Sequence, residues 1–86
     1  MEPYKVVFKK SIAKDLKGIP KQDVKRILEA IQKLATNPRP PQAKKLSAQE
    51  RYRLRQGNYR ILYSIEDGKL VITVVRVGHR RDIYRK

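Results

Sequence analysis

Arginine is the residue type in this chain best suited to chemistry, and it is unevenly distributed. Eight of the ten arginines lie between Arg51 and Arg85, whereas the first half is rich in lysine. The planar guanidinium of arginine holds a phosphate through two parallel hydrogen bonds, while lysine acts as a hydrated point charge. The pattern indicates a lysine-rich scaffold followed by an arginine-rich working surface, unless the bias only reflects genome composition.

The overall charge points to polyanions as partners. The 86 residues contain 22 Lys and Arg against 8 Asp and Glu, a formal net charge of +14. A charge of this size favours a polyanion, but it does not tell which polyanion this is or whether it is bound or cut. A chain of this length is expected to form a single domain over residues 1–86.

Other kinds of chemistry are poorly represented. The absence of cysteine excludes disulfides and thiolate metal sites, and the single histidine, His79, argues against a histidine zinc site. We therefore expect no metal and no cofactor. No apolar run approaches the roughly 20 residues that span a bilayer, and residues 1–10 lack the apolar segment of a signal peptide. We expect a cytoplasmic protein that does not bind membranes.

The first half is expected to form a short strand and two helices. Residues 4–8 alternate as in a strand, and residues 9–17 have the spacing of a helix that stops at Gly18. A second helix, with Pro20 in its first turn, has the clearest apolar stripe of the chain and runs to residue 35. Two amphipathic helices of this kind should cover one face of a sheet.

The second half follows a connector and changes to the period of strands. Residues 38–42 contain three prolines and are expected to be extended. Strands are expected at residues 51–55, 59–65 and 70–77, joined by turns at 56–58 and at Asp67-Gly68. Residues 78–86 form either a short helix or a tail. The fold class is therefore α+β, in the order β-α-α-β-β-β, with the last three strands as an antiparallel meander.

The lengths of the two hairpin loops predict which residues face each other. A two-residue loop at Gly57-Asn58 predicts the pairs Gln56 with Tyr59, Arg55 with Arg60, Arg53 with Leu62 and Arg51 with Ser64. A two-residue loop at Asp67-Gly68 predicts Glu66 with Lys69, Ser64 with Val71, Leu62 with Thr73 and Arg60 with Val75. A slip of one residue would exchange the two faces of the sheet.

This register separates an apolar face from a basic one. The face expected to lie in the core carries Tyr52, Leu54, Tyr59, Ile61, Tyr63, Ile65, Leu70, Ile72 and Val74. The other face carries Arg51, Arg53, Arg55 and Arg60, with Ser64 and Thr73 beyond them. Like charges directly opposite each other destabilise a sheet, so the pairing of Arg55 with Arg60 suggests that a phosphate sits between them. The alternative is a solvated basic face whose arginines splay apart.

The end of the chain adds cations and one aromatic ring. If residues 78–86 turn helically, Arg80 and Tyr84 share a face at i and i+4. Tyr84 then either stacks on a base of single-stranded RNA or anchors the terminus to the core together with Ile83. His79 is the single histidine of the chain, and after Gly78 it is more typical of a turn than of a catalyst.

These residues resemble a known family, the RelE toxins of prokaryotic toxin–antitoxin modules. The likeness is carried by Tyr52-Arg53-Leu54-Arg55, Gly57-Asn58-Tyr59-Arg60-Ile61-Leu62-Tyr63, Val77-Gly78-His79-Arg80 and Tyr84. It implies two helices against a curved antiparallel sheet, similar to small microbial RNases. It also implies metal-independent, ribosome-dependent cleavage of mRNA in the A site. An acidic, RelB-like antitoxin would neutralise the protein, which would meet DNA only through that antitoxin.

The resemblance also assigns roles to individual residues. Arg60 matches a transition-state-stabilising arginine, Arg80 an arginine at the leaving group or phosphate, and Tyr84 a tyrosine that stacks on a base and activates the 2′-hydroxyl. Arg53 and Arg55 match positions that are lysines in well-studied members, and arginine binds phosphate there but cannot act as a base. We expect the phosphate-binding set to comprise Arg51, Arg53, Arg55, Lys44, Lys45 and Arg81.

Two other functions remain open from the sequence. A ParE-like toxin has the same fold and poisons DNA gyrase, although the joint presence of Arg60, Arg80 and Tyr84 argues against it. A non-catalytic basic protein that binds RNA or the ribosome would leave translated mRNA intact.

Overall fold

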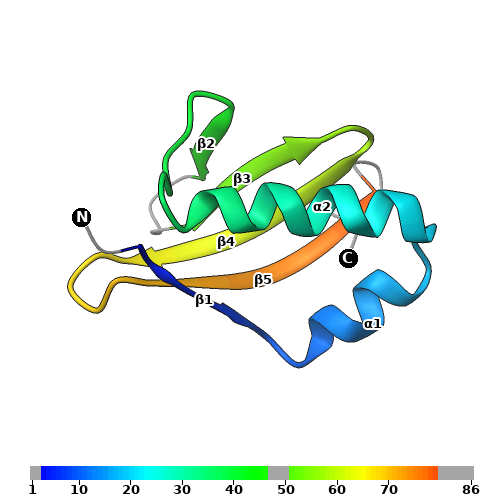
Figure 1. Ribbon diagram of the computed structural model, residues 1–86, viewed down its shortest axis with the longest axis horizontal. Helices are drawn as coiled ribbons and strands as arrows, with labels where there is room; N and C mark the ends of the chain where they lie inside the picture. Colours follow the sequence, from blue (N-terminus) through cyan, green and yellow to red (C-terminus); the bar gives the residue numbers. More distant parts are fainter. Residues whose placement is uncertain (1–2, 47–50, 80–86) are drawn as a thin grey trace.

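Two helices lie on one side of a single mixed sheet (Figure 1). The computed structural model describes residues 3–46 and 51–79 of the chain. The elements in these residues are β1 (Lys5–Phe8), α1 (Ser11–Lys17), α2 (Lys21–Leu34), β2 (Ala43–Leu46), β3 (Arg51–Gln56), β4 (Tyr59–Glu66) and β5 (Val71–His79). The strand order is β1-β5-β4-β3-β2. The α+β fold class is therefore confirmed.

The helices begin one or two residues later than predicted, and α2 ends at Leu34, one residue earlier than predicted. The amide of Lys9 donates to the carbonyl of Val74 over 3.1 Å, so it continues the pairing of β1 and cannot enter α1. Pro20 lies one residue before α2, where its carbonyl accepts the amides of Asp23 and Val24. This arrangement uses the fixed φ of proline while the helix needs no amide from it.

Two features of the sheet differ from the expected antiparallel meander. β1 pairs in parallel with β5, with Lys5 opposite Val71. The connector at residues 38–42 was expected to be extended, but it bends and then forms a turn in which the Ala43 amide donates to the Pro40 carbonyl over 2.9 Å. The chain then forms β2, which pairs antiparallel with the edge of β3. After three prolines that cannot donate, residues 43–46 again carry amides that can complete a ladder. The order in this part is therefore β-α-α-β-β-β-β.

The register of the first hairpin is confirmed in full. Its pairs are Gln56 with Tyr59, Arg55 with Arg60, Leu54 with Ile61, Arg53 with Leu62, Tyr52 with Tyr63 and Arg51 with Ser64. Gly57 has a φ of +60°, in the left-handed region that a turn of the primed type needs at its first central residue. The turn fixes the register because a loop of only two residues determines which residues on either side of it pair.

The register of the second hairpin is two residues away from the prediction. Glu66 pairs with Val71, so four residues form the loop instead of two. Leu70 closes this loop with a φ of +54° and is exposed, so its assignment to the core was wrong. A shift of two residues keeps every side chain on its face, because strand faces alternate with period two.

A β-bulge then changes the second half of β5. Tyr63 pairs with Val74, but the preceding residue Leu62 pairs with Arg76, which leaves Val75 as the extra residue. Both Val74 and Val77 are consequently buried although three positions separate them. The predicted partner of Arg60 was Val75, and its actual partner is Gly78.

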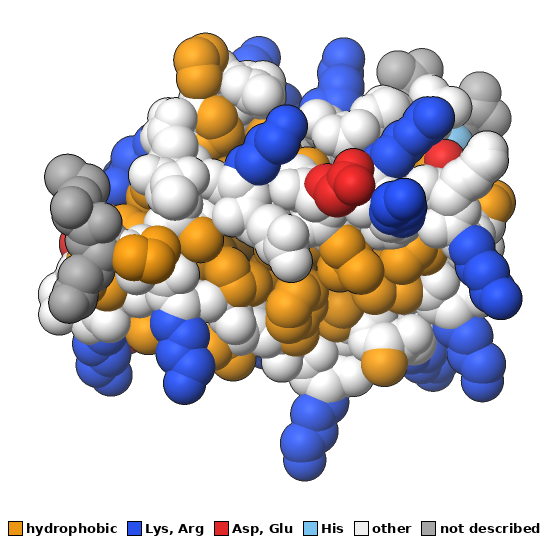
Figure 2. All heavy atoms as spheres, in the orientation of Figure 1, with side chains coloured by type: hydrophobic (Ala, Val, Ile, Leu, Met, Phe, Trp, Pro, Cys, Tyr) orange, Lys and Arg blue, Asp and Glu red, His pale blue; other side chains and the backbone are white. Residues whose placement is uncertain are grey.

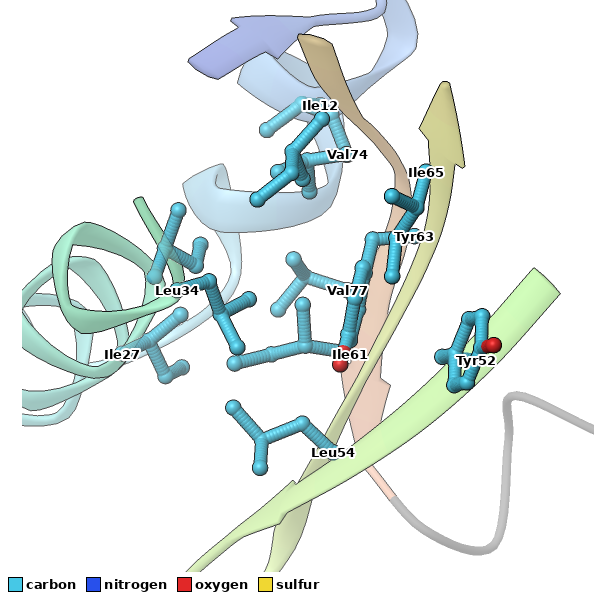
Figure 3. Packing of buried hydrophobic residues seen from close by; sticks show 12 residues of the cluster. Ile12, Ile27, Leu34, Tyr52, Leu54, Ile61, Tyr63, Ile65, Val74 and Val77 are labelled. Atoms are coloured by element: carbon cyan, nitrogen blue, oxygen red, sulfur yellow. The ribbon is translucent and has the colours of Figure 1, made fainter. Parts of the chain in front are cut away.

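The core lies between the helices and the inner face of the sheet, as Figure 3 shows for side chains from both layers. Its buried members are Ile12, Ile27, Ile31, Leu34, Tyr52, Leu54, Ile61, Tyr63, Ile65, Ile72, Val74 and Val77. Seven of the nine predicted sheet positions are among them. Tyr59 is half-buried against the cluster, and Leu70 is the exception described above. Each fully buried aliphatic side chain contributes about 1.5–3 kcal/mol.

A polar cluster fixes the end of the sheet that carries the β4–β5 loop. Both guanidinium nitrogens of Arg39 contact the carboxylate of Asp67, at 2.9 and 3.2 Å, and the Tyr4 hydroxyl donates to the same carboxylate at 2.7 Å. Arg39 Nε also donates to the Tyr52 hydroxyl, and the Tyr63 hydroxyl donates to the carbonyl of Pro38. These bonds attach the connector to the sheet. In the part of the chain that the structure describes, no helix is long and apolar enough to cross a lipid bilayer.

Candidate nucleic-acid interface

The outer face of the sheet gathers arginines from three neighbouring strands. The register places Lys44, Arg53, Leu62 and Arg76 in one row across β2, β3, β4 and β5. The next row contains Arg55, Arg60 and Gly78. Arg51 lies in the row on the other side, opposite Ser64 and then Thr73. We call the set Lys44, Arg51, Arg53, Arg55, Arg60 and Arg76 the basic face.

Arg60 lies in the end row of this face, beside the turn at Gly57-Asn58 that joins β3 and β4. Arg55 lies directly opposite it on β3, and Gly78, which has no side chain, lies opposite it on β5. The Nε atom of Arg60 is buried, so part of its guanidinium is shielded from solvent. Opposite residues of an antiparallel pair have Cβ atoms about 4.5–5.5 Å apart, which brings two guanidinium groups within reach of one phosphate.

The two lysines assigned to phosphate binding do not share a face. Lys44 pairs with Arg53 and belongs to the basic face. Lys45 pairs with Tyr52, whose side chain is buried on the helix side of the sheet. Neighbouring residues of a strand point to opposite faces, so the run Lys44-Lys45 cannot place both cations beside Arg60.

Arg76 is a member of the basic face that the sequence pattern missed. Uninterrupted alternation from Ile72 and Val74 would place Arg76 on the core side, and only the bulge turns it outward. The signal available in the sequence is the run Val74-Val75-Arg76-Val77, in which apolar residues stop alternating. Arg80, Arg81 and Tyr84 lie outside the described residues.

His79 lies on the side of the sheet opposite to the basic face. It pairs with Tyr59 in the register, and the two rings meet edge to face with their centroids 5.8 Å apart. The Tyr59 hydroxyl donates to Asp23 over 3.3 Å. Burial, and then the charge and hydrogen bond of Asp23, raise the pKa of Tyr59, so this hydroxyl loses its proton less readily than an ordinary tyrosine does. His79 was expected in a turn, but it is the last residue of β5.

Helix α1 holds the final part of β5. The strand β1 ends at Phe8, so no strand formed by residues 3–46 and 51–79 lies beside the edge of β5 beyond Val74. There the amide of Val77 donates to Oδ2 of Asp15 over 3.0 Å. Asp15 thus supplies the acceptor that a further strand would have provided, directly before Gly78 and the residues that follow it.

The basic face offers electrostatic rather than acid–base chemistry. The rows that contain Arg53 and Arg60 hold no carboxylate and no imidazole among the described residues. Within residues 3–46 and 51–79, no three His, Cys, Asp or Glu side chains lie close enough together to hold a metal ion. Fixed guanidinium groups of this kind stabilise negative charge that develops on a phosphate.

Comparison with known proteins supplies the family. A family model described as the ParE toxin of type II toxin–antitoxin systems matches residues 6–84. The Mycobacterium tuberculosis protein "Toxin RelG" is 33% identical over 88 residues, which cover 98% of this chain and 99% of that protein. The chain belongs to the RelE/ParE family of toxins. The RelE resemblance read from the sequence is therefore confirmed.

Further relatives of the toxin agree in sequence and structure. "Putative toxin RelE1" of Methanocaldococcus jannaschii is 31% identical over 86 residues, covering 95% of this chain and 96% of that protein. A chain in the crystal structure of the toxin–antitoxin complex RelBE2 from Mycobacterium tuberculosis superposes with a TM-score of 0.79 at 31% identity, over 91% of this toxin and 99% of that chain. The family model is named for ParE and these relatives are named Rel, so the names establish a toxin and leave its target open.

Proposed function

We propose that this toxin is a ribosome-dependent endoribonuclease that cuts translated mRNA in the A site and thereby inhibits translation and growth. The observation that carries the proposal is Arg60 in the end row of the basic face, opposite Arg55 on β3 and Gly78 on β5. Gly78 itself presents no side chain to an RNA backbone that contacts Arg60. A gyrase poison has no need for arginines arranged around one phosphate.

The reaction that suits such a face is attack by the neighbouring 2′-hydroxyl on the phosphate. The 2′-oxygen forms a bond to phosphorus, the bond to the 5′-oxygen breaks, and the products are a 2′,3′-cyclic phosphate and a 5′-hydroxyl. The 2′-hydroxyl loses a proton and the departing 5′-oxygen gains one. Arg60 and Arg55 stabilise the additional negative charge of the phosphorane, which is where preorganised donors contribute most. The reaction as proposed uses no metal and no cofactor.

The remaining roles come from the resemblance. Arg80 would act at the leaving group or the phosphate, and Tyr84 would stack on a base and activate the 2′-hydroxyl. An ordinary tyrosine has a pKa of about 10, so Tyr84 would depend on its cationic neighbours Arg80, Arg81 and Arg85 in the sequence. Arg51, Arg53 and Lys44 would hold flanking phosphates.

The ribosome would supply what this small face lacks. Correct alignment of a 2′-hydroxyl with its phosphate contributes up to about 7–11 kcal/mol in favourable intramolecular reactions. A ribosome that holds the mRNA in its A site provides this alignment, so weak acid–base equipment is sufficient. A ribosomal site of action also places the toxin in the cytoplasm.

We also propose an acidic antitoxin of the RelB type as its partner. The similar Mycobacterium tuberculosis chain comes from a toxin–antitoxin complex. Figure 2 shows the helix side of this toxin, where hydrophobic side chains gather in a band and Lys and Arg side chains stand around it. Part of that side is a groove of about 380 Å³ lined by Phe8, Ile12, Ala13, Leu16 and Leu28 beside Lys9 and Lys10. An amphipathic, negatively charged segment fits such a surface. DNA would be met through the antitoxin alone.

The decisive experiment measures two reactions, mRNA cleavage on ribosomes and DNA supercoiling by gyrase, with the wild-type toxin and the same pair of variants. Purified ribosomes carrying an mRNA are incubated with the wild-type toxin, with Arg60→Ala and with Arg26→Ala, and the mRNA is mapped by primer extension. Arg26 is a matched control because it is an exposed arginine of α2, in the other layer. We expect codon-phased cuts with the wild type and Arg26→Ala, and none with Arg60→Ala.

The alternatives predict other results from the same samples. A ParE-like toxin would leave the mRNA intact and inhibit DNA supercoiling by gyrase. A non-catalytic RNA-binding protein would leave both reactions unaffected while Arg60→Ala weakens binding. Intact mRNA with the wild-type toxin on programmed ribosomes would overturn the proposal.

A further inference from the structure

The bulge in β5 creates a feature that the roles assigned above do not use. It turns Arg76 outward and places it opposite Leu62, whose other neighbour across the sheet is Arg53. A half-buried leucine is thus flanked by two arginines in one row. An apolar surface between cations is an arrangement that a nucleotide can occupy, with its sugar or base on the leucine and its phosphate on an arginine.

The position of this row relative to Arg60 is set by the register. Arg60 lies two residues before Leu62 on β4, on the same face, and Arg76 is its diagonal neighbour on β5. Diagonal neighbours in a sheet lie about 7–8 Å apart, within reach of long side chains. A single-stranded RNA whose scissile phosphate contacts Arg60 therefore brings its next nucleotide over Leu62 and Arg76.

Arg76 is also available for a ligand. Within the described part of the chain its guanidinium forms no hydrogen bond or ion pair, whereas Arg39 is fully engaged with Asp67 and Tyr52. Asp15, which contacts the neighbouring Val77, accepts the amide of that residue. A half-buried arginine at a bulge that has no partner among residues 3–46 and 51–79 is suited to an external anion.

We propose that Leu62 and Arg76 form a subsite for the nucleotide that adjoins the scissile phosphate of a single-stranded RNA. The inference rests on the proposed function, because that function places the scissile phosphate at Arg60. Arg76 binds the neighbouring phosphate and Leu62 supports the ribose or base. Neither group reads the edge of a base, so the subsite binds RNA without selecting its sequence. It is a binding subsite, and Arg76 takes no part in the bond-breaking step.

The test separates binding from catalysis. Steady-state cleavage of mRNA on ribosomes is measured for wild type, Arg76→Ala, Arg76→Lys and Leu62→Ala. We expect Arg76→Ala to raise KM about tenfold with kcat within about twofold, and to lower the slope of log KM against log salt by about 0.7, the contribution of one phosphate contact to a single strand. Arg76→Lys keeps the charge and should restore the salt slope. Leu62→Ala should raise KM without changing that slope.

Two controls guard against a merely structural effect. Arg26→Ala removes an exposed arginine from α2, and Val71→Ala shortens a half-buried apolar side chain of the same sheet face near Lys5. Both should keep the wild-type KM and salt slope. Thermal unfolding shows whether each variant is folded, and a KM increase that follows only the loss of stability would overturn the proposal. So would an Arg76→Ala variant that behaves like Arg26→Ala.

A binding measurement keeps the subsite testable if the proposed function fails. A fluorescein-labelled single-stranded hexanucleotide with 2′-deoxyriboses cannot be cut by 2′-hydroxyl attack, and its fluorescence anisotropy reports binding directly. If the wild type cuts no mRNA, the proposed function fails by itself. Weaker oligonucleotide binding by Arg76→Ala and Leu62→Ala than by Arg26→Ala and Val71→Ala still supports the subsite, and equal binding by all four overturns it.

Discussion

Arg55 and Arg60 lie directly opposite each other on β3 and β4, and no carboxylate shares their row among the described residues. Like charges in this position destabilise a sheet. The cost is comparable in size to the roughly 0.2–1 kcal/mol that a favourable cross-strand pair contributes. The fold thus holds two cations together at a site where a phosphate would relieve their repulsion. Residues that weaken a fold and serve a ligand show a trade-off between stability and activity.

The first prediction follows from this repulsion. Arg55→Gln should raise the free energy of unfolding by a few tenths of a kcal/mol at low ionic strength, and the gain should shrink as salt screens the pair. The same variant should reduce mRNA cleavage. Arg26→Gln, which removes an exposed charge from α2, is the control for general charge repulsion. Thermal melts at two salt concentrations measure the stability of both variants. An equal gain in stability for Arg55→Gln and Arg26→Gln would contradict a specific repulsion between Arg55 and Arg60.

A second prediction concerns the shape of the cation at position 60. Arg60→Lys keeps the charge but loses the planar fork that binds two phosphate oxygens. We expect kcat to fall by roughly 10²–10³ in Arg60→Ala, the effect of removing one preorganised donor to developing charge. Arg60→Lys should recover only a small part of this loss. Single-turnover cleavage on ribosomes measures it, and full activity in the lysine variant would show that charge alone is required.

The sequence was sufficient where the structure is decided locally. The hairpin from Arg51 to Glu66 has a two-residue loop with Gly57 in its left-handed position, so the loop fixed the register and both faces. The second hairpin could not be predicted in the same way, because Asp67 in its loop binds Arg39 and Tyr4, which are distant in sequence. Long-range bonds outweighed the local preference of an Asp-Gly pair for a short turn.

The candidate site also divides into a part that the sequence predicted and a part that it did not. The grouping of arginines on β3 and β4 followed from alternation, whereas the sequence pattern did not separate Lys44 from Lys45 and did not include Arg76. The pairing of β2 with β3 decides which of Lys44 and Lys45 faces Arg53. The bulge opposite Leu62 decides the side of Arg76. Both are tertiary features that a single strand pattern does not contain.

A third prediction tests the role of Asp67 through pH. Hydrogen bonds from Arg39 and then from Tyr4 lower the pKa of this carboxyl below its ordinary value. A lowered pKa in the folded state stabilises the protein above the unfolded pKa of about 3.9, and this stability is lost as the pH falls through the folded value. Asp67→Asn should therefore lower the melting temperature at neutral pH. The difference from wild type should vanish in acid, and a difference that is unchanged at low pH would count against the assignment.

A fourth prediction uses the backbone of the same loop. Leu70 has a φ of +54°, a conformation that is unfavourable by roughly 1–2 kcal/mol for residues with a Cβ atom, and its side chain is exposed. Leu70→Gly should raise the free energy of unfolding by about 0.5–1 kcal/mol. This is a net gain, because the larger conformational entropy of glycine in the unfolded chain offsets part of the relieved strain. Leu70→Ala keeps the strain and should bring no gain. Urea denaturation of the three proteins compares them, and a destabilised glycine variant would show that the side chain contributes more than the strain.

The last prediction concerns the contact between Asp15 and the Val77 amide, which joins α1 to the end of β5. Asp15→Ala leaves this amide without its acceptor, at a cost of about 1–3 kcal/mol for a buried group and less where water can replace it. Amide hydrogen exchange at Val77 should accelerate, and exchange at Ile72 in the core should follow only the global stability. Since Gly78 faces Arg60 one residue further along, the loosened strand should also lower kcat. Asp15→Asn retains an oxygen acceptor and should restore both the protection and the rate, whereas equal behaviour of the two variants would show that the charge of Asp15, rather than its hydrogen bond, holds the strand.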